Sequence, residues 1–280
     1  MSIRIAFSPG VDAGIFSYGL AIGAAKAGGL EAEVVAAPLP ALNDRASRGE
    51  WEATMISAAV YPYLRGRYVL ARCGACFAQG SGPILAAPEP LSAADLARAT
   101  IAVGDATSSA TVLLQLSLPG VRTRLLPVDK IAQATKMGLA DCALLARGDG
   151  DAFRQTGLCC VVDLGATWAR KTGGLPVPLA CMAIRSDLPD DLRCGIQEAL
   201  RASIRFGLDH RAEALRFARE RSGDPDTPSP ADLAGRVGAM GREVLNVDAP
   251  QRKALEEFLR RGHQANLLPD ALPLEFVADA

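Results

Sequence analysis

The chain has 280 residues, of which 49% are hydrophobic, so it can form one large domain or two small ones with real cores. Its 30 basic and 31 acidic residues leave a net charge near −1, without the basic excess of nucleic-acid-binding proteins. No run reaches the roughly 18 apolar residues of a membrane span, and the N-terminus shows no signal peptide. We therefore expect a cytoplasmic protein with no nucleic-acid or membrane partner; the sequence leaves a homodimer open.

The first third of the chain alternates short apolar runs with helical patterns. We expect strands at 3–7, 32–36, 54–57, 68–72 and 83–87, and helices at 14–27, 42–47 and 59–64. This alternation is typical of a parallel or mixed sheet covered by helices.

The same pattern then restarts after residue 99 and gives way to helices near the C-terminus. We expect strands at 100–103, 121–126, 142–146, 160–164 and 177–185, with helices at 108–116, 129–137 and 166–171. The last third should be helical, with segments from 189 to about 208 and at 212–221, 231–245 and 251–261, the last one ended by Gly262.

Two restarts of the pattern predict an α/β protein with two lobes and a helical C-terminal part. Residues 1–87 and 186–280 would form the first lobe and residues 88–185 the second. Two chain crossings between the lobes would make a hinge, an arrangement that resembles the type II periplasmic-binding-protein clamshell. One continuous doubly wound sheet is the alternative that the pattern leaves open.

Polar residues follow several of the expected strands, where ligands bind in open α/β sheets. Thr107, Ser108 and Ser109 begin a helix, where hydroxyls and backbone amides hold a carboxylate or phosphate well. The same residue types are also the preferred helix caps, so both interpretations stay open. Ser57 has the same ambiguity, and Asn43 is either a ligand donor or a residue of a helix surface.

Charged and thiol groups give weaker signals. Arg147 follows the apolar strand 142–146 and is either a fork for a carboxylate or a solvated loop residue. His210 and His263 are the only histidines, and both are expected on the surface. Cys73 and Cys76 have the CxxC spacing, for which ordinary thiols are favoured over a metal or redox site because no further ligands are suitably placed.

An ordered set of short blocks resembles one family. The blocks are Ser8-Pro9 with Phe16 and Tyr18, Leu42-Asn43 with Gly49, Ile56-Ser57 with Tyr61, Gly80 to Pro83, Ala102-Val103 with Ser108 to Ala110, Asp163 to Trp168, Thr172-Gly173 and Pro176 to Leu179. Over about residues 3–220 the chain resembles the 1,4-dihydroxy-6-naphthoate synthases of the futalosine route to menaquinone.

The resemblance implies a function as well as a fold. Family members convert cyclic dehypoxanthine futalosine into 1,4-dihydroxy-6-naphthoate without metal or cofactor, in a two-lobed fold that closes over a carboxylated, ring-bearing substrate. It also implies that a substrate-binding set converges on the cleft between the lobes, namely Asn43, Ser57, Thr107, Ser108 and Ser109, together with Arg147.

The sequence departs from the family at its catalytic position. Where the family has a histidine base, this chain has Arg147, which stays protonated and cannot act as a base near neutral pH. Asp12, Asp149 or Asp151 would have to replace it. Two readings therefore stay open: a divergent lyase, or a non-catalytic cytoplasmic protein that binds or senses a small anionic organic ligand.

Overall fold

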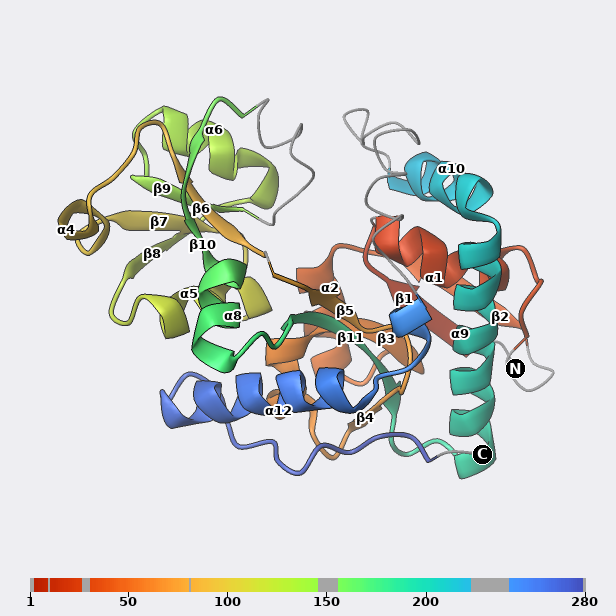
Figure 1. The fold of residues 1–280 in the computed structure, drawn as a ribbon. Helices are drawn as coiled ribbons and strands as arrows, with labels where there is room; N and C mark the ends of the chain where they lie inside the picture. The colour runs from red at the N-terminus through yellow and green to blue at the C-terminus, as the bar shows by residue number, and fades with distance from the viewer. Residues whose placement is uncertain are drawn as a thin grey trace. The chain divides into compact units, whose positions relative to one another are not determined.

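The computed structural model describes residues 3–9, 11–26, 31–80, 82–145, 156–222 and 242–278. Within these segments, none of the helices is long and apolar enough to cross a membrane. The chain forms two compact units (Figure 1): unit 1 comprises Met1–Cys76, Ala180–Arg252 and Ala271–Ala280, and unit 2 comprises Phe77–Leu179 and Lys253–Asp270. The predicted division into a first lobe of residues 1–87 and 186–280 and a second lobe of residues 88–185 stays a prediction.

Unit 1 is built on a mixed sheet. Its strand order is β2 (Ala32–Ala36), β1 (Ile3–Phe7), β3 (Ala53–Ser57), β11 (Val177–Arg185) and β4 (Tyr68–Leu70). β1 runs parallel to β2 and β3, whereas β11 is antiparallel to β3 and β4. All five residues of β3 are buried, as expected for a central strand covered on both faces.

Helices cover this sheet and supply most of the C-terminal part. They are α1 (Val11–Ala21), α2 (Leu39–Ser47), α3 (Tyr61–Leu64), α9 (Asp190–Asp209) and α10 (Arg211–Ser222). α1 packs against both α9 and α10. Ile196, Leu200 and Ile204 of α9 follow each other at four-residue spacing and are fully buried, because this spacing keeps them on one helix face.

The crossing of α1 and α9 depends on a glycine. A Cβ atom at Gly207 would lie only 2.1 Å from the carbonyl oxygen of Ile15, and backbone cannot move aside as a flexible side chain can. We expect Gly207→Ala to lower the free energy of unfolding by about 3 kcal/mol, in the upper range for overpacked interiors.

Chemical denaturation checks this prediction, with Gly195→Ala on the same helix as the matched control. Gly195 is only half-buried, so alanine there should raise the free energy of unfolding by about 0.5–1 kcal/mol through helix propensity. Equal effects of the two changes would show that close packing at Gly207 does not limit the crossing.

Unit 2 is built on a second mixed sheet. Its strand order is β10 (Cys159–Asp163), β6 (Ile84–Ala87), β9 (Cys142–Leu145), β7 (Thr100–Val103) and β8 (Arg122–Leu125). β7 is parallel to β8 and β9, and β6 is antiparallel to β9 and β10. The short strand β5 (Cys76–Ala78) lies where the first segment of unit 1 ends.

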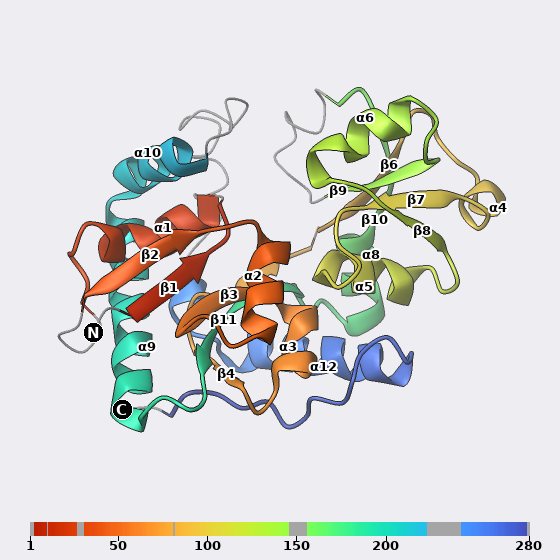
Figure 2. The same ribbon diagram turned by 180° about the vertical axis from the view of Figure 1, so that it is seen from behind.

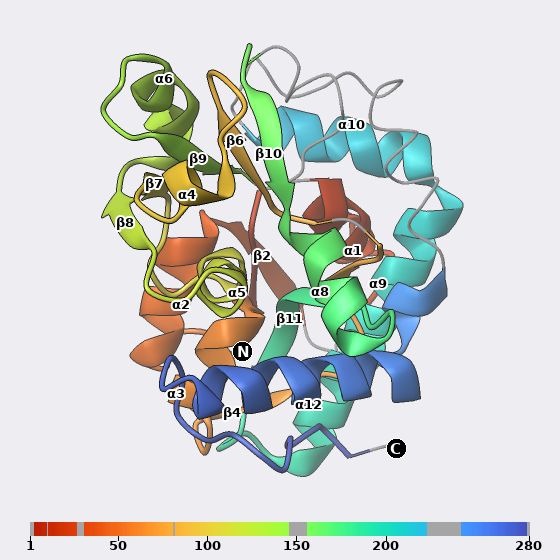
Figure 3. The ribbon, with the colours of Figure 1, turned by 60° about the vertical axis from the view of Figure 1, so that its left-hand side comes forward.

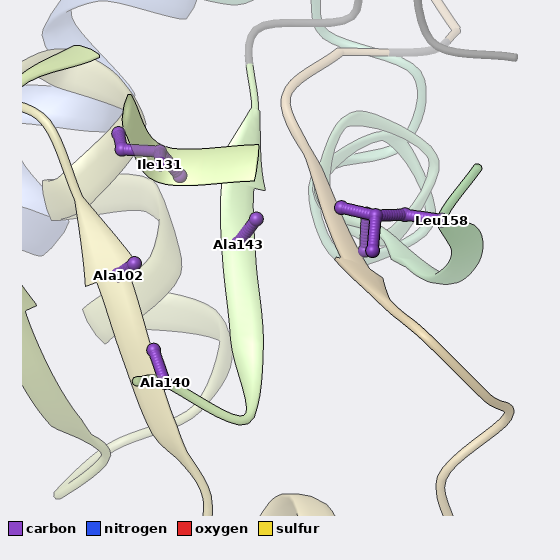
Figure 4. Close-up of a cluster of buried hydrophobic side chains, with 6 residues drawn as sticks. Ala102, Ile131, Ala140, Ala143 and Leu158 are labelled. Carbon is purple, nitrogen blue, oxygen red and sulfur yellow. The ribbon is translucent and has the colours of Figure 1, made fainter. Parts of the chain in front are cut away.

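Small residues let a helix approach this sheet closely. Ile131 of α6 (Ile131–Lys136) packs in one cluster with Ala102 and Ala143 of neighbouring strands (Figure 4). On the other side, α5 (Ser109–Ser117) and α8 (Leu164–Thr172) pack side by side (Figures 1 and 3). The remaining helices are α4 (Ala93–Leu96) and α12 (Ala249–Gln264), the second of which packs Phe258 against Trp168.

The α/β class, the two sheets and the helical C-terminal part confirm the predicted fold class. Strand 177–185 is confirmed residue for residue. The expected end of the last helix at Gly262 is wrong, because α12 continues to Gln264 and the glycine instead gives room to Leu268, whose Cδ1 would lie 2.5 Å from a Cβ. Most of the helix expected at 231–245 lies outside the described residues. The part that is described, Arg242–Leu245, forms a 3₁₀ turn.

Candidate functional site

Two of the predicted site residues meet in unit 1. Asn43 lies in α2, and Ser57 is the last residue of β3, directly before a 3₁₀ turn. The side-chain Oδ1 of Asn43 accepts a hydrogen bond of 3.0 Å from the backbone N–H of Ser57. Both residues are buried, with exposed fractions of 6% and 0%. Asn43 is therefore no surface residue: it orients the end of β3.

The other half of the Asn43 amide is unsatisfied. Its Nδ2 group is buried and has no hydrogen-bond partner among the described residues. Leaving a buried donor unpaired costs about 1–3 kcal/mol, and such groups are rare in folded proteins. A ligand oxygen that accepts from Nδ2 would remove this cost, so the amide is suited to bind a carboxylate or carbonyl group.

The hydroxyl-bearing turn that begins α5 in unit 2 holds three other predicted residues, Thr107, Ser108 and Ser109. Ser108 is the N-cap, and its Oγ accepts from the backbone N–H of Thr111 at 3.2 Å. Ser109 is 2% exposed, and its Oγ donates to the carbonyl of Leu179 at 2.8 Å. The capping interpretation is thus correct for Ser108, and a binding role of these hydroxyls stays a prediction.

Asp105 shapes this turn, and sequence reasoning missed it. Its Oδ1 accepts from both the backbone N–H and the Oγ1 of Thr107, each at 2.8 Å, and its carbonyl accepts from the Oγ1 of Thr111 at 2.6 Å. Its other oxygen, Oδ2, is buried and has no partner in the described part of the chain. An aspartate two residues before a threonine at a helix start is a recognisable turn signal that could have identified it.

The structure does not describe the side chains of the remaining candidates. Arg147 lies outside the described residues, as do Asp149 and Asp151, and of the Asp12 side chain nothing is described. Their predicted roles at the catalytic position stay predictions. His210 and His263 are both exposed, as the sequence predicts.

Burial explains the chemistry of the cysteines. None of the seven, all of which are described, is in a disulfide. Burial raises the pKa of the Cys73 thiol to about 12, so it stays protonated near neutral pH, whereas metal binding and redox exchange need the thiolate. No group of three potential metal ligands is found among the described histidine, cysteine and acidic residues. Burial therefore favours the interpretation of Cys73 as an ordinary thiol, and that of Cys76 stays a prediction.

Thiol labelling tests this account of the cysteines. Burial raises the pKa of both Cys73 and Cys181 from 9.0 to about 12, which makes their thiolate fraction at pH 8 about a thousandfold smaller. Cys160 is exposed. In the folded protein we expect an aromatic disulfide reagent to label Cys160 rapidly, and Cys73 and Cys181 only after unfolding; Cys160→Ser should remove the rapid phase. Rapid labelling of Cys73 would contradict the account.

Comparison with known proteins now identifies the relatives of the chain. A family model described as menaquinone biosynthesis matches residues 3–264. The 1,4-dihydroxy-6-naphthoate synthase of Thermus thermophilus is 33% identical over 218 residues, which cover 78% of this chain and 79% of that protein. The synthase of Streptomyces coelicolor is 30% identical over 275 residues, which cover 96% and 95%.

Solved structures share the fold of the chain. The crystal structure of a protein from Archaeoglobus fulgidus has a TM-score of 0.85 at 29% identity and covers 95% of this chain and 98% of its own. The periplasmic aliphatic sulphonate-binding protein SsuA from Escherichia coli has a TM-score of 0.68 at 14% identity, covering 96% and 89%. The second likeness shows the fold alone, and it confirms the predicted periplasmic-binding-protein-like class. The chain belongs to the menaquinone-biosynthesis family, alongside enzymes named as 1,4-dihydroxy-6-naphthoate synthases.

Proposed function

We propose that the protein binds a small carboxylated, ring-bearing ligand and acts in the cytoplasm as a divergent lyase related to 1,4-dihydroxy-6-naphthoate synthase. Its substrate would be cyclic dehypoxanthine futalosine or a similar compound, handled without a cofactor. The observation that carries the proposal is the buried Asn43 amide, which accepts from Ser57 through Oδ1 and whose Nδ2 has no partner among the residues that the structure describes. Family membership supports the reaction class.

The chemistry of Asn43 and of the start of α5 supports an anionic ligand. Asn43 Nδ2 can only donate, so it favours an acceptor such as a carboxylate oxygen. The start of α5 offers backbone N–H groups and the positive end of the helix dipole, which also favour negative charge. These groups bind and orient a ligand; neither an amide nor a hydroxyl is a base near neutral pH.

A binding or sensing protein is the second candidate, and one observation favours it. Arginine at position 147, where the family has its histidine, leaves the chain without the expected base while suiting it to hold an anion. Under this alternative the ligand would be bound with the same dependence on Asn43 and Ser109, but it would not be converted.

Serine substitutions test the proposed binding role of the α5 turn. Changing Ser108 and Ser109 together to alanine should weaken binding of 1,4-dihydroxy-6-naphthoate by tenfold to over a hundredfold in calorimetry. The reason is that a lost hydrogen bond to a charged group is worth about 1.5–3 kcal/mol.

Because Ser108 also caps α5, the experiment needs a capping control. Ser92 caps α4 in the same unit by accepting from the N–H of Asp95. Ser92→Ala should lower stability by about 1 kcal/mol and leave binding unchanged. Unchanged binding in the Ser108 and Ser109 double variant would count against the role of the turn.

A further inference from the structure

The strand β8 forms an open edge of the unit 2 sheet (Figure 2). It is last in the strand order, pairs with β7 alone among the described strands, and all four of its residues, Arg122–Leu125, are exposed. An edge strand that is uncovered on both faces is a template for pairing with another chain.

The backbone of β8 has hydrogen-bonding groups left for such a partner. The N–H of Leu126 donates to the carbonyl of Val103 on β7 at 3.0 Å. The backbone groups of successive residues in a strand point in opposite directions. The N–H and C=O groups of Arg124 therefore point toward β7, and those of Thr123 and Leu125 point away from it. In the described part of the chain, Thr123 and Leu125 form no hydrogen bond besides the pairing with β7.

Exposed large apolar side chains belong to β8 and to the segments that follow it. Leu125, Val128, Met137 and Leu139 are 64%, 67%, 68% and 47% exposed, and they are four of the six exposed large hydrophobic residues in the described segments. The Nη1 of Arg124 donates to the carbonyl of Leu139 at 2.7 Å, which ties the loop after α6 to β8. We call the surface formed by Arg122–Leu125 and the adjoining Leu139 the β8 strip.

Charge decides which partner fits the β8 strip. Arg122 and Arg124 belong to the strand itself. Lys130 follows in the 3₁₀ turn η2 (Val128–Lys130), whose one acidic residue, Asp129, is paired with it at 3.2 Å. This local positive charge contrasts with the net charge near −1 of the chain. A second copy would place like charges together, and a lipid surface has no strand to satisfy the backbone groups.

The two arginines do not shield the edge. Arg122 donates to the carbonyl of Arg98, and Arg124 to that of Leu139, so both side chains are held by their own unit. Charged residues often protect an edge strand by projecting across it, but here they are positioned beside it.

We propose that the β8 strip is a docking site for a protein partner that adds an extended, acidic segment with alternating apolar residues to the edge of the sheet. The backbone of Thr123 and Leu125 pairs with this segment, the apolar residues of the strip cover its apolar side chains, and the cations of the strip attract its carboxylates. The proposal is independent of the ligand site and of the reaction.

A model peptide tests it directly. The probe is a fluorescein-labelled heptapeptide of alternating valine and glutamate, titrated with the full-length protein and followed by fluorescence anisotropy at low salt. A peptide with lysine in place of glutamate should bind at least tenfold more weakly. Thr123→Pro removes the outward donor but keeps the β7 pairing, so it should weaken binding at least tenfold with an unchanged melting temperature, while Thr123→Val should not.

Leu125→Asp gives a second variant in case the proline change prevents folding; it should weaken binding of the acidic peptide by a similar factor. Failure of the acidic peptide to bind, or equal binding to the native protein and to both variants, overturns the proposal. So does sedimentation that shows a dimer dissociated by Leu125→Asp, which assigns the strip to a second copy. Binding to vesicles of anionic lipid that these variants abolish overturns it in favour of a membrane surface.

Discussion

The native protein should convert cyclic dehypoxanthine futalosine at a rate about 10²–10⁴-fold below that of its Thermus thermophilus relative, and Arg147→His should recover much of the difference. The family reaction, as the resemblance implies it, needs a neutral base that removes a proton, and general-base assistance contributes about this factor. Arginine cannot supply it, because its guanidinium stays protonated. Formation of 1,4-dihydroxy-6-naphthoate, measured by mass spectrometry, checks the prediction.

Arg147→Gln is the matched control for this experiment. It removes the positive charge without adding a base, so it should weaken binding of an anionic substrate and give no gain in turnover. Turnover by the native protein at the rate of the relative would contradict the prediction and would point to another base, with Asp149 and Asp151 as the first to substitute.

Asn43→Asp should weaken binding of 1,4-dihydroxy-6-naphthoate more than a hundredfold. Aspartate keeps an oxygen that accepts from the Ser57 N–H at the 3.0 Å distance of the native bond, but it replaces the unpartnered Nδ2 donor by a second oxygen. A hydrogen bond to a charged group, worth about 1.5–3 kcal/mol, is lost, and repulsion between two carboxylates is added. Isothermal titration calorimetry measures the change.

Gln197→Glu controls for the burial of a new acid. Gln197 is a 1% exposed amide in the same unit, and its Oε1 accepts from the backbone N–H of Arg72 at 2.8 Å, much as Asn43 does from Ser57. The two changes should destabilise the fold to a similar degree, since each buries a carboxylate, but only Asn43→Asp should affect binding. Equal loss of affinity in both variants would show that the effect is indirect.

Periodicity predicted the elements of the fold where local patterns decide them. The apolar run at 177–184 is unbroken because most of β11 is buried, and the bounds of the strand, Val177–Arg185, are those expected. The prediction for Gly262 was wrong because this glycine serves tertiary packing. It lies within α12 and leaves room for the side chain of Leu268, and the helix does not end there. Likewise, the pattern placed the end of the first helix at residue 27, whereas α1 ends at Ala21.

The candidate site was predictable in its residue types more than in its geometry. Ser57 and Asn43 are 14 positions apart, and only the packing of α2 against β3 brings the amide to the N–H of Ser57. The sequence left Ser108 open between cap and ligand donor, and the structure shows the capping bond to Thr111. Asp105 escaped notice because its effect is exerted through hydrogen bonds to its neighbours in the turn.

One titration tests the central claim, that the protein binds a small carboxylated, ring-bearing ligand through Asn43. Calorimetry should show saturable one-to-one binding of 1,4-dihydroxy-6-naphthoate to the native protein, and at least tenfold weaker binding of 1,4-dihydroxynaphthalene, which has the rings without the carboxylate. Asn43→Asp should remove this preference, and Gln197→Glu should keep it. Equal affinity of the native protein for the two compounds, or no binding of either, would contradict the account.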